Sequence, residues 1–329
     1  MIEGREIDAN PLFQKMGLDT NGVHPFVETP KMYPFKENGD IRQNWSYFMS
    51  FGLLALKQKI QDEDSQPPKT MGIVGIGNGI EGVAAAKIFP ESLRELHVVD
   101  TDSEILTGAL TNIRRNVDRT RLKIVGHVGS FAEPLIQKDI KLDLLTGNVP
   151  NLPSDEDQTL VTGADRGTFM PRALVEAYAP PEKFVRWALS TQYAYLKSAA
   201  QAVKEGGSVL TLVGGRFPLA LTDQLFQETG YQDTHEVISG YKEQTEAEPD
   251  FRGYSAFEGA FGVSFDFYPH AWAEEELRSN KIGNPTKIHN AVKIKALLQS
   301  QRVSAQQALE QFHTGSAFGH TVHLFRGVK

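Results

Sequence analysis

The sequence predicts an α/β protein with a mainly parallel β-sheet and helices on both of its faces. An apolar run over 71–76, typical of a buried parallel strand, leads into a glycine-rich turn and a predicted helix over 81–89. A second apolar run over 96–99 ends at Asp100, about twenty residues beyond the last glycine. This order of strand, glycine turn, helix, strand and acid is typical of a βαβ unit that binds a dinucleotide or a nucleoside.

The glycine turn has the spacing Gly-x-Gly-x-Gly, formed by Gly75, Gly77 and Gly79. Glycines let the backbone turn tightly and approach a ligand closely. A pyrophosphate site would need a further glycine at the position of the bulky Ile80. The tighter spacing resembles the S-adenosylmethionine (SAM) site of class I methyltransferases, which cradles an amino-acid tail and a ribose. A nicotinamide or flavin site, and a turn that binds nothing, are the alternatives.

That resemblance implies ligand contacts for several neighbours of the turn. Asn78 lies within it, and Asp100 with Thr101 ends the second strand, where a carboxylate can accept hydrogen bonds from both ribose hydroxyls. Ser130 and Phe131 follow a third predicted strand, at the position that holds adenine in this family. Serine stands where the family usually has an acid that binds the adenine amine, and we expect Phe131 to stack on the base. An ordinary loop is the alternative.

The amino-acid composition limits which classes of partner and which kinds of chemistry this protein can have. The chain has 329 residues, 40% hydrophobic and 23% charged, with a net charge of −7 and no cysteine. Such a chain can bury a core, and the absence of cysteine excludes disulfides, thiolate zinc sites and cysteine nucleophiles. Without a basic block or a long apolar run, neither nucleic acid nor a membrane is expected as a partner. We therefore expect a cytoplasmic enzyme with a small-molecule substrate and no metal; the oligomeric state stays open.

The chain divides into three expected parts. Residues 1–68 form an N-terminal extension or lid, 69–245 a SAM-binding core with an insertion over 154–183, and 246–329 a C-terminal part that completes the sheet. A polar, proline-rich stretch marks the first boundary. A long insertion at the ligand edge of a sheet is usually functional, so we expect this one to form a wall of the substrate pocket.

The extension has two interpretations. Prolines between 24 and 35 oppose a helix there, and helical spacing predicts a helix over 41–61. The extension is either a structural segment packed on the sheet edge or a lid. As a lid, its aromatic side chains would close over the sulfonium of SAM, since a desolvated cation gains about 0.5–2 kcal/mol against aromatic rings. These side chains are Phe26, Tyr33, Phe35, Trp45 and Tyr47.

Apolar periodicity predicts the other elements. The expected helices span 101–118, 182–204, 288–300 and 304–312, with one more ending at 229. The expected strands span 122–125, 142–146, 208–213, 236–241, 262–268 and 321–325.

The turn Asn148-Val149-Pro150-Asn151 follows the strand over 142–146, beside the point where ligands of open α/β sheets bind. Methyltransferases that act on planar amines carry an Asn/Asp-Pro-Pro-aromatic turn at this place. Val149 replaces the first proline and Asn151 the aromatic residue, which disfavours a planar base and suits a small polar nucleophile. Asn148 and Asn151 are expected to orient the attacking lone pair, and Val149 to line the pocket. A plain β-turn is the alternative.

The order of these motifs also resembles the methyltransferase domain of methionine S-methyltransferases and the related azetidine-2-carboxylate synthases. The resemblance covers about 70–232 and departs at Ile73, where an acid usually precedes the glycine turn. It implies a Rossmann-like, seven-stranded class I methyltransferase fold. It also implies a small amino-acid-like nucleophile. Our own expectation is a small amino-acid or amine nucleophile, with Tyr178 and Tyr33 near the sulfonium and Arg216 in the substrate pocket.

Four functions remain open at this point. The first is methyl transfer by direct SN2 displacement at the sulfonium of SAM. The second is cyclisation of SAM by its own α-amine to azetidine-2-carboxylate, with release of methylthioadenosine. The third, of another class, is a non-catalytic SAM-binding module. The fourth is a nicotinamide oxidoreductase, which would bind NAD tightly and be indifferent to SAM. Positioning and desolvation could supply most of the rate of either of the first two reactions, because well-oriented partners remove about 7–11 kcal/mol of a barrier.

Overall fold

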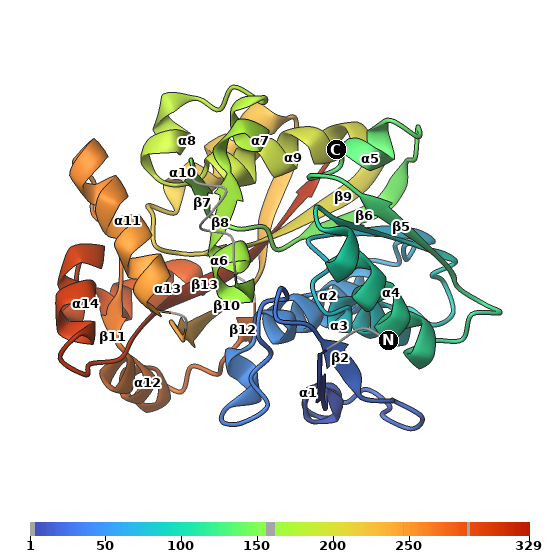
Figure 1. Cartoon of the computed structure of the whole chain (residues 1–329), viewed down its shortest axis with the longest axis horizontal. Coiled ribbons are helices and arrows are strands. Elements are labelled where there is room, and N and C mark those ends of the chain that lie inside the picture. The colour runs from blue at the N-terminus through green and yellow to red at the C-terminus, as the bar shows by residue number, and fades with distance from the viewer. Residues whose placement is uncertain (1–3, 156–161, 246, 288–289) are drawn as a thin grey trace.

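The computed structural model describes residues 4–155, 162–245, 247–287 and 290–329. Its centre is a mixed sheet in the order β12-β10-β13-β9-β6-β3-β4-β5, with β11 paired to β13 off this path (Figure 1). The strands are β3 (Thr70–Val74), β4 (Glu95–Asp100), β5 (Lys123–Val128), β6 (Leu142–Gly147), β9 (Val203–Gly214), β10 (Asp233–Glu243), β11 (Tyr268–Pro269), β12 (Thr286–Lys287) and β13 (Phe318–Val328).

The pairing of these strands confirms the predicted fold class. The neighbours β5, β4, β3, β6 and β9 are parallel, whereas β13 runs antiparallel between β9 and β10. Numbered along the chain from β3, the seven long strands take the order 3-2-1-4-5-7-6. This is the Rossmann-like class I methyltransferase fold.

Helices cover both faces of the sheet and divide the core in two (Figure 1). On one face lie α2 (Trp45–Asp62), α3 (Ile80–Ile88) and α4 (Ser103–Asn116), which bury Leu53, Val83 and Ile113 in one apolar cluster. On the other lie α5 (Glu133–Ile136), α9 (Ser190–Ala202) and α10 (Ala220–Thr229), which bury Leu135, Tyr195 and Leu225 in a second cluster. Strands sandwiched in this way read as continuous apolar runs, which is why the sequence revealed them.

The N-terminal extension packs on the first of these faces. Its strands β1 (Arg5–Ile7) and β2 (Phe26–Glu28) form a small antiparallel sheet, and the short helix α1 (Asn10–Lys15) lies between them in the chain. As predicted, the proline-rich stretch contains no helix. The helix predicted over 41–61 is confirmed as a 3₁₀ turn, η1 (Ile41–Gln43), followed by α2.

The prediction of a single helix over 182–204 is wrong. The segment forms α8 (Glu182–Arg186) and α9, because Ala188 adopts a left-handed backbone with φ of 53° and ends the first helix. The amide of Leu189 then closes the turn by donating to the carbonyl of Phe184 at 2.8 Å. The apolar spacing continued through the break because Leu189 stays buried on the same side as its neighbours.

The strand predicted over 262–268 is also wrong. Phe265 and Phe267 are buried and Asp266 faces Lys295, so the alternation is real, but before β11 the backbone pairs with other described residues only in a single bridge between Phe267 and Val303. This stretch packs instead through its side chains against α11 (Ala247–Phe261) and α14 (Ala305–Phe312). The sequence missed α11 and also α12 (His270–Ser279), whereas α13 (Ala291–Leu298) and α14 confirm the two predicted helices; residues 288–289 of the former prediction lie outside the described ranges.

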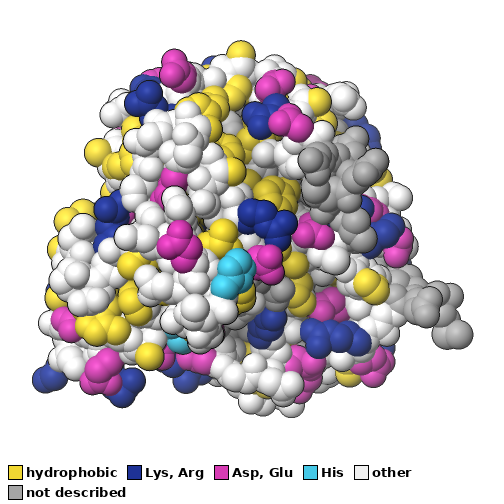
Figure 2. Space-filling view, turned by 60° about the vertical axis from the view of Figure 1, so that its left-hand side comes forward, with side chains coloured by type: hydrophobic (Ala, Val, Ile, Leu, Met, Phe, Trp, Pro, Cys, Tyr) yellow, Lys and Arg dark blue, Asp and Glu magenta, His cyan; other side chains and the backbone are white. Residues whose placement is uncertain are grey.

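The expected insertion over 154–183 has more regular structure than its composition suggested. Strands β7 (Leu152–Ser154) and β8 (Phe169–Pro171) pair in parallel around α6 (Gly163–Thr168), and α7 (Arg172–Glu176) follows. Residues 156–161 lie outside the described part of the chain. On the face shown in Figure 2, basic and acidic side chains are interspersed and neither kind gathers into a patch. Among the described residues, no helix has the length and apolarity needed to cross a bilayer.

The close packing below the end of β6 leads to a stability prediction. A Cβ atom at Gly147 would lie 2.5 Å from Cζ of Tyr195, whose hydroxyl donates to the carbonyl of Leu210 at 3.0 Å. Gly147→Ala should therefore lower the free energy of unfolding by about 1–3 kcal/mol, the usual cost of overpacking. As a control, Gly259→Ala in α11 meets no atom within 4 Å and should raise it by about 0.5–1 kcal/mol. Equal urea midpoints for the two variants would contradict this packing.

Candidate functional site

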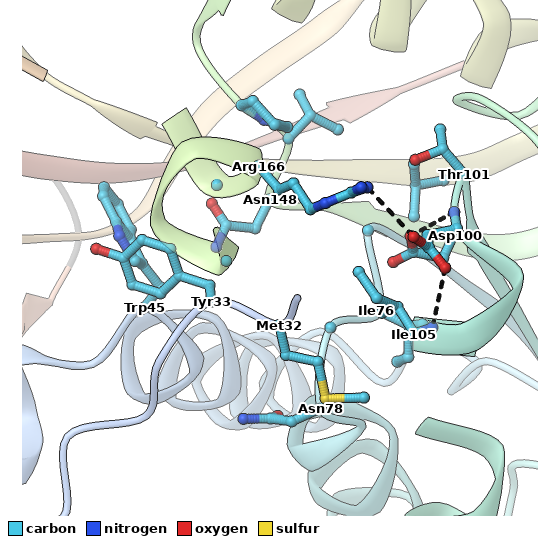
Figure 3. A pocket seen from close by; sticks show the side chains of 18 of the residues that line it. Met32, Tyr33, Trp45, Ile76, Asn78, Asp100, Thr101, Ile105, Asn148 and Arg166 are labelled. Atoms are coloured by element: carbon cyan, nitrogen blue, oxygen red, sulfur yellow. Dashed lines mark hydrogen bonds and ion pairs between the residues drawn. The ribbon is translucent and has the colours of Figure 1, made fainter. Parts of the chain in front are cut away.

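A cavity of about 640 Å³ lies at the carboxyl ends of β3, β4 and β6 (Figure 3). This is the switch point where an open α/β sheet binds ligands, and the volume suits a small-molecule site. Ten of the predicted site residues line the cavity: Tyr33, Gly75, Gly77, Asn78, Asp100, Thr101, Phe131, Asn148, Val149 and Asn151.

The glycine turn forms the floor of the cavity. Gly75 and Gly77 have φ of 72° and 54°, the left-handed region in which side chains are strained. The Gly75 amide donates to the carbonyl of Val99 at 2.9 Å, so the turn is fastened to the end of β4. A Cβ atom at Gly75 would lie 3.4 Å from the carbonyl oxygen of Asn148. The glycine turn and the Asn148 turn are therefore direct neighbours.

Asp100 stands beside this floor, at the end of β4. Its Oδ1 accepts from the amide of Asp102 at 3.1 Å, and backbone amides at Gly77 and Thr101 also point at the carboxylate. Burial raises the pKa of Asp100 to about 6, although these amides act in the opposite direction. At neutral pH the group is mostly ionised and can accept hydrogen bonds from ligand hydroxyls.

The Asn148 turn forms the adjoining wall. In Figure 3 the Asn148 side chain lies between Tyr33 on one side and Asp100 on the other. Asn151 is held from behind: its Oδ1 accepts from Nε2 of Gln192 at 3.2 Å, and Oε1 of Gln192 accepts from the Thr211 hydroxyl at 2.6 Å. Of the two asparagines, Asn151 is thus already engaged by the protein.

A roof covers the cavity, made by residues 31–36 of the extension and 163–174 of the insertion. The two segments touch closely. The Gly163 amide donates to the carbonyl of Pro30 at 3.0 Å, and a Cβ atom at Gly167 would lie 2.2 Å from the ring of Tyr33. Only glycine lets α6 approach the extension this closely.

Both roof segments bind the same carboxylate at the start of α4. Asp102 lies 3.5 Å from Nζ of Lys31 in the extension and 3.3 Å from a guanidinium nitrogen of Arg166 in α6. In Figure 3 the Arg166 side chain reaches across toward the Asp100 loop. These ion pairs are partly exposed, so each contributes modestly, but together they join three segments distant in sequence.

The extension is fastened to the glycine turn by one buried side chain. Asn112 in α4 accepts at Oδ1 from the amide of Val27 at 2.9 Å, and its Nδ2 donates to the carbonyls of Val27 at 2.8 Å and of Asn78 at 2.9 Å. Nearby, the buried Glu28 accepts from the Phe35 amide at 2.7 Å, which closes the loop that presents Tyr33. Of the five aromatic residues proposed for a lid, Tyr33, Phe35 and Trp45 line the cavity, whereas Phe26 and Tyr47 are core residues.

Four predicted site residues do not line the cavity. Gly79, with φ of 86°, is the N-cap residue just before α3, and its Cβ position lies 2.9 Å from the carbonyl oxygen of Ala109, so its role is helix packing. Ser130 is absent from the lining although its neighbour Phe131 is present. The other two, Tyr178 and Arg216, are held behind the cavity wall.

Tyr178 and Arg216 are engaged with other protein groups. The Tyr178 hydroxyl donates to the Glu133 carboxylate, and its ring packs edge-to-face against Phe131 with the ring centres 5.7 Å apart. Burial and this carboxylate raise the pKa of Tyr178 well above its usual value, so the group stays neutral. Arg216 is 2% exposed and donates to Gln244 at 2.6 Å. Neither side chain is placed to touch a ligand directly.

Apart from Asp100, sequence reasoning missed the charged residues that line the cavity, of which Glu81, Arg166 and Lys242 bear most on its chemistry. Glu81 lies in the first turn of α3, is buried, and has no hydrogen-bond partner at Oε2 among the described residues. Burial raises its pKa to about 8. An acid just after the glycine turn was a visible signal for Glu81, whereas nothing local distinguishes Arg166 or Lys242 from other basic residues.

Comparisons with known proteins give structural likenesses only. No family model and no curated protein matches this sequence. Similar solved structures include a candidate O-methyltransferase from Nostoc punctiforme (14% identity, TM-score 0.37), a ribosomal protein L11 methylase from Lactobacillus delbrueckii subsp. bulgaricus (16%, 0.37) and a candidate RNA methyltransferase from Pyrococcus horikoshii (12%, 0.40). The likeness covers 59%, 66% and 91% of this chain and 54%, 83% and 91% of those chains. The chain thus spans about half the length of the first. With TM-scores below 0.5, these likenesses decide neither the fold nor the activity, which rest on the strand order and cavity of this chain.

Proposed function

We propose that this protein binds SAM in the roofed cavity and catalyses its reaction with a small amino-acid or amine nucleophile. The observation that carries the proposal is the continuity of one cavity from the glycine turn and Asp100 to the Asn148 turn. The left-handed glycines, the buried carboxylate and the amide-bearing turn are the parts that a nucleoside with an amino-acid tail requires. A nicotinamide dinucleotide fits less well, because Ile80 is buried where its pyrophosphate would need a glycine.

Different residues of the cavity would bind different parts of SAM. Asp100 and Thr101 would hold the ribose, the Phe131 side of the cavity the adenine, and the Gly75–Gly77 floor the methionyl part. Glu81 compensates for Ile73, since it brings to the same floor the carboxylate that the strand end lacks. A buried carboxylate without a full set of partners attracts a cation, and SAM carries both an ammonium and a sulfonium.

Asn148 is the group best placed to orient a nucleophile. Its side-chain oxygen can accept a hydrogen bond from an N–H group and thereby direct the lone pair, which is all that an already activated sulfonium demands. The nucleophile must be neutral and the site dry. Tyr33 and Phe35 in the roof would exclude water, and removal of water strengthens every charge interaction beneath them.

The products formed from SAM distinguish the reactions. Purified protein incubated with SAM alone should form no S-adenosylhomocysteine. When an amino-acid or amine acceptor is added, S-adenosylhomocysteine should appear. Formation of azetidine-2-carboxylate and methylthioadenosine without an acceptor would instead establish cyclisation, with homoserine lactone marking spontaneous decay. Tight binding of SAM with no product under either condition would identify a binding module. Indifference to SAM together with tight binding of NAD would overturn the proposal.

Asn148→Ala should lower the turnover number by about 100-fold, because a misoriented nucleophile loses most of the benefit of alignment. The dissociation constant of S-adenosylhomocysteine, measured by calorimetry, should change much less. Asn280→Ala, an exposed amide at the end of α12, serves as the control and should leave both quantities unchanged. Equal turnover in the two variants would exclude Asn148 from the reaction.

Because Glu81 titrates within the cavity, we expect the affinity for S-adenosylhomocysteine to depend on pH. Its pKa lies near 8 in the free protein, and an ammonium ligand favours the ionised form, so the affinity for S-adenosylhomocysteine should rise between pH 6 and 8. Linkage limits the rise to about tenfold per pH unit, and it should level off above the free pKa. Glu81→Gln should abolish this component.

Methylthioadenosine, which lacks the amino-acid tail, is the control ligand for this titration. It shares the ribose contact of Asp100, so any titration of Asp100 appears with both ligands. A rise of equal size for both ligands, or a rise that survives in Glu81→Gln, would show that Glu81 does not face the tail.

A further inference from the structure

Lys242 of β10 forms the end of the cavity opposite to Asp100. Its side chain is 1% exposed, yet it is one of the residues that line the cavity. Its Nζ lies 5.2 Å from the centre of the Trp45 ring, and Figure 3 shows Trp45 on the far side of the cavity from Asp100 and Thr101. None of the roles proposed for binding the nucleoside uses this end.

The ammonium of Lys242 is only partly satisfied by the protein. It has three donors, and the acceptor the structure gives it among the described residues is the carbonyl of Glu243, at 2.8 Å. The Glu243 carboxylate does not accept a hydrogen bond from the Lys242 ammonium, because successive side chains of a strand point to opposite faces. It lies instead 3.9 Å from Nε2 of His270.

The charges around Lys242 do not balance within the described residues. Behind it, Arg216 is equally buried; its guanidinium lies over the Tyr254 ring, donates to the Tyr254 hydroxyl at 3.2 Å, and is 3.6 Å from Asp250. The buried Asp250 carboxylate is therefore shared between two buried cations, and the Glu243 carboxylate acts on Lys242 only from the other face of the strand.

His320, stacked near Trp45 with ring centres 5.7 Å apart, does not alter this balance. Burial lowers its pKa well below the usual value, so the ring is neutral. Burial also lowers the pKa of Lys242, to about 8, which leaves the ammonium mostly charged at neutral pH. A buried and incompletely paired charge is costly, and an anion in the cavity would offset that cost.

We propose that Lys242 binds the carboxylate of an α-amino-acid ligand at this end of the cavity, and so selects amino acids over simple amines. The inference rests on the proposed function and names the substrate class of the same site. A carboxylate fits better than a phosphate, because Lys242 supplies a single buried ammonium while the Arg216 guanidinium is held by Gln244, Asp250 and Tyr254. The carboxylate belongs either to a separate acceptor or to the methionyl tail of SAM itself.

The test is calorimetry on wild type, Lys242→Met and Lys242→Gln, with Lys197→Met on the exposed face of α9 as the charge-matched control. Three nucleosides serve as probes: S-adenosylhomocysteine, its decarboxylated counterpart and methylthioadenosine. The protein saturated with S-adenosylhomocysteine is then titrated with each of the common L-amino acids and with 3-methylthiopropylamine. Unchanged binding of methylthioadenosine shows that the two variants are folded.

Two results would support the inference, and they distinguish the source of the carboxylate. If it belongs to a separate acceptor, both Lys242 variants lose about 10- to 100-fold in affinity for an amino acid, as expected for a charge-assisted contact, while S-adenosylhomocysteine binds normally. If it belongs to the nucleoside, they lose the same factor for S-adenosylhomocysteine and nothing for its decarboxylated counterpart.

Other results would overturn the inference. It fails if both variants retain wild-type affinity for every carboxylate probe, or if Lys197→Met weakens binding equally. It also fails if 3-methylthiopropylamine binds as tightly as the amino acids and, at the same time, decarboxylated S-adenosylhomocysteine binds as tightly as S-adenosylhomocysteine. A wild-type protein that binds none of the three nucleosides would instead contradict the proposed function, and this inference with it.

Discussion

The buried amide of Asn112 is the interaction on which the architecture of the site depends. It uses its oxygen and its nitrogen to join the N-terminal extension at Val27 to the glycine turn at Asn78, and it is fully buried in α4. An amide satisfied on both sides in a dry environment is expensive to break, because each separated partner would be left without a hydrogen bond. The extension is consequently a fixed part of the cavity and not a tail beside it.

From this anchor the cavity acquires its roof. The extension is bound by Asn112 and Glu28, the insertion meets it through Gly163 and Gly167, and both reach the Asp102 carboxylate. Such contacts enclose a polar floor beneath aromatic side chains. Under the proposed function this enclosure matters more than an acid or a base, because a sulfonium is already activated and needs alignment and a dry surrounding.

Acidic and basic side chains lie at opposite ends of the cavity, an arrangement that is visible only in three dimensions. Asp100 places a carboxylate near the glycine turn, where Glu81 adds a second acid that ionises near pH 8, whereas Lys242, backed by Arg216, places positive charge at the opposite end. A ligand with a cationic part and a carboxylate would be oriented by this separation before any reaction occurs. Burial makes the effect larger than the same charges would produce on a surface.

The sequence by itself determined the parallel sheet, the glycine turn, Asp100 and the Asn148 turn, because each is encoded in a few adjacent residues. Only the tertiary structure decided which distant residues complete the site. Gly79, Tyr178 and Arg216 were predicted as site residues but serve other roles: Gly79 packs a helix, Tyr178 donates to Glu133 and Arg216 donates to Gln244. Arg166 and Lys242 line the cavity although no motif in their own segments indicates it. Local patterns record backbone geometry and burial, but the meeting of side chains across a fold depends on long-range packing that no short stretch contains.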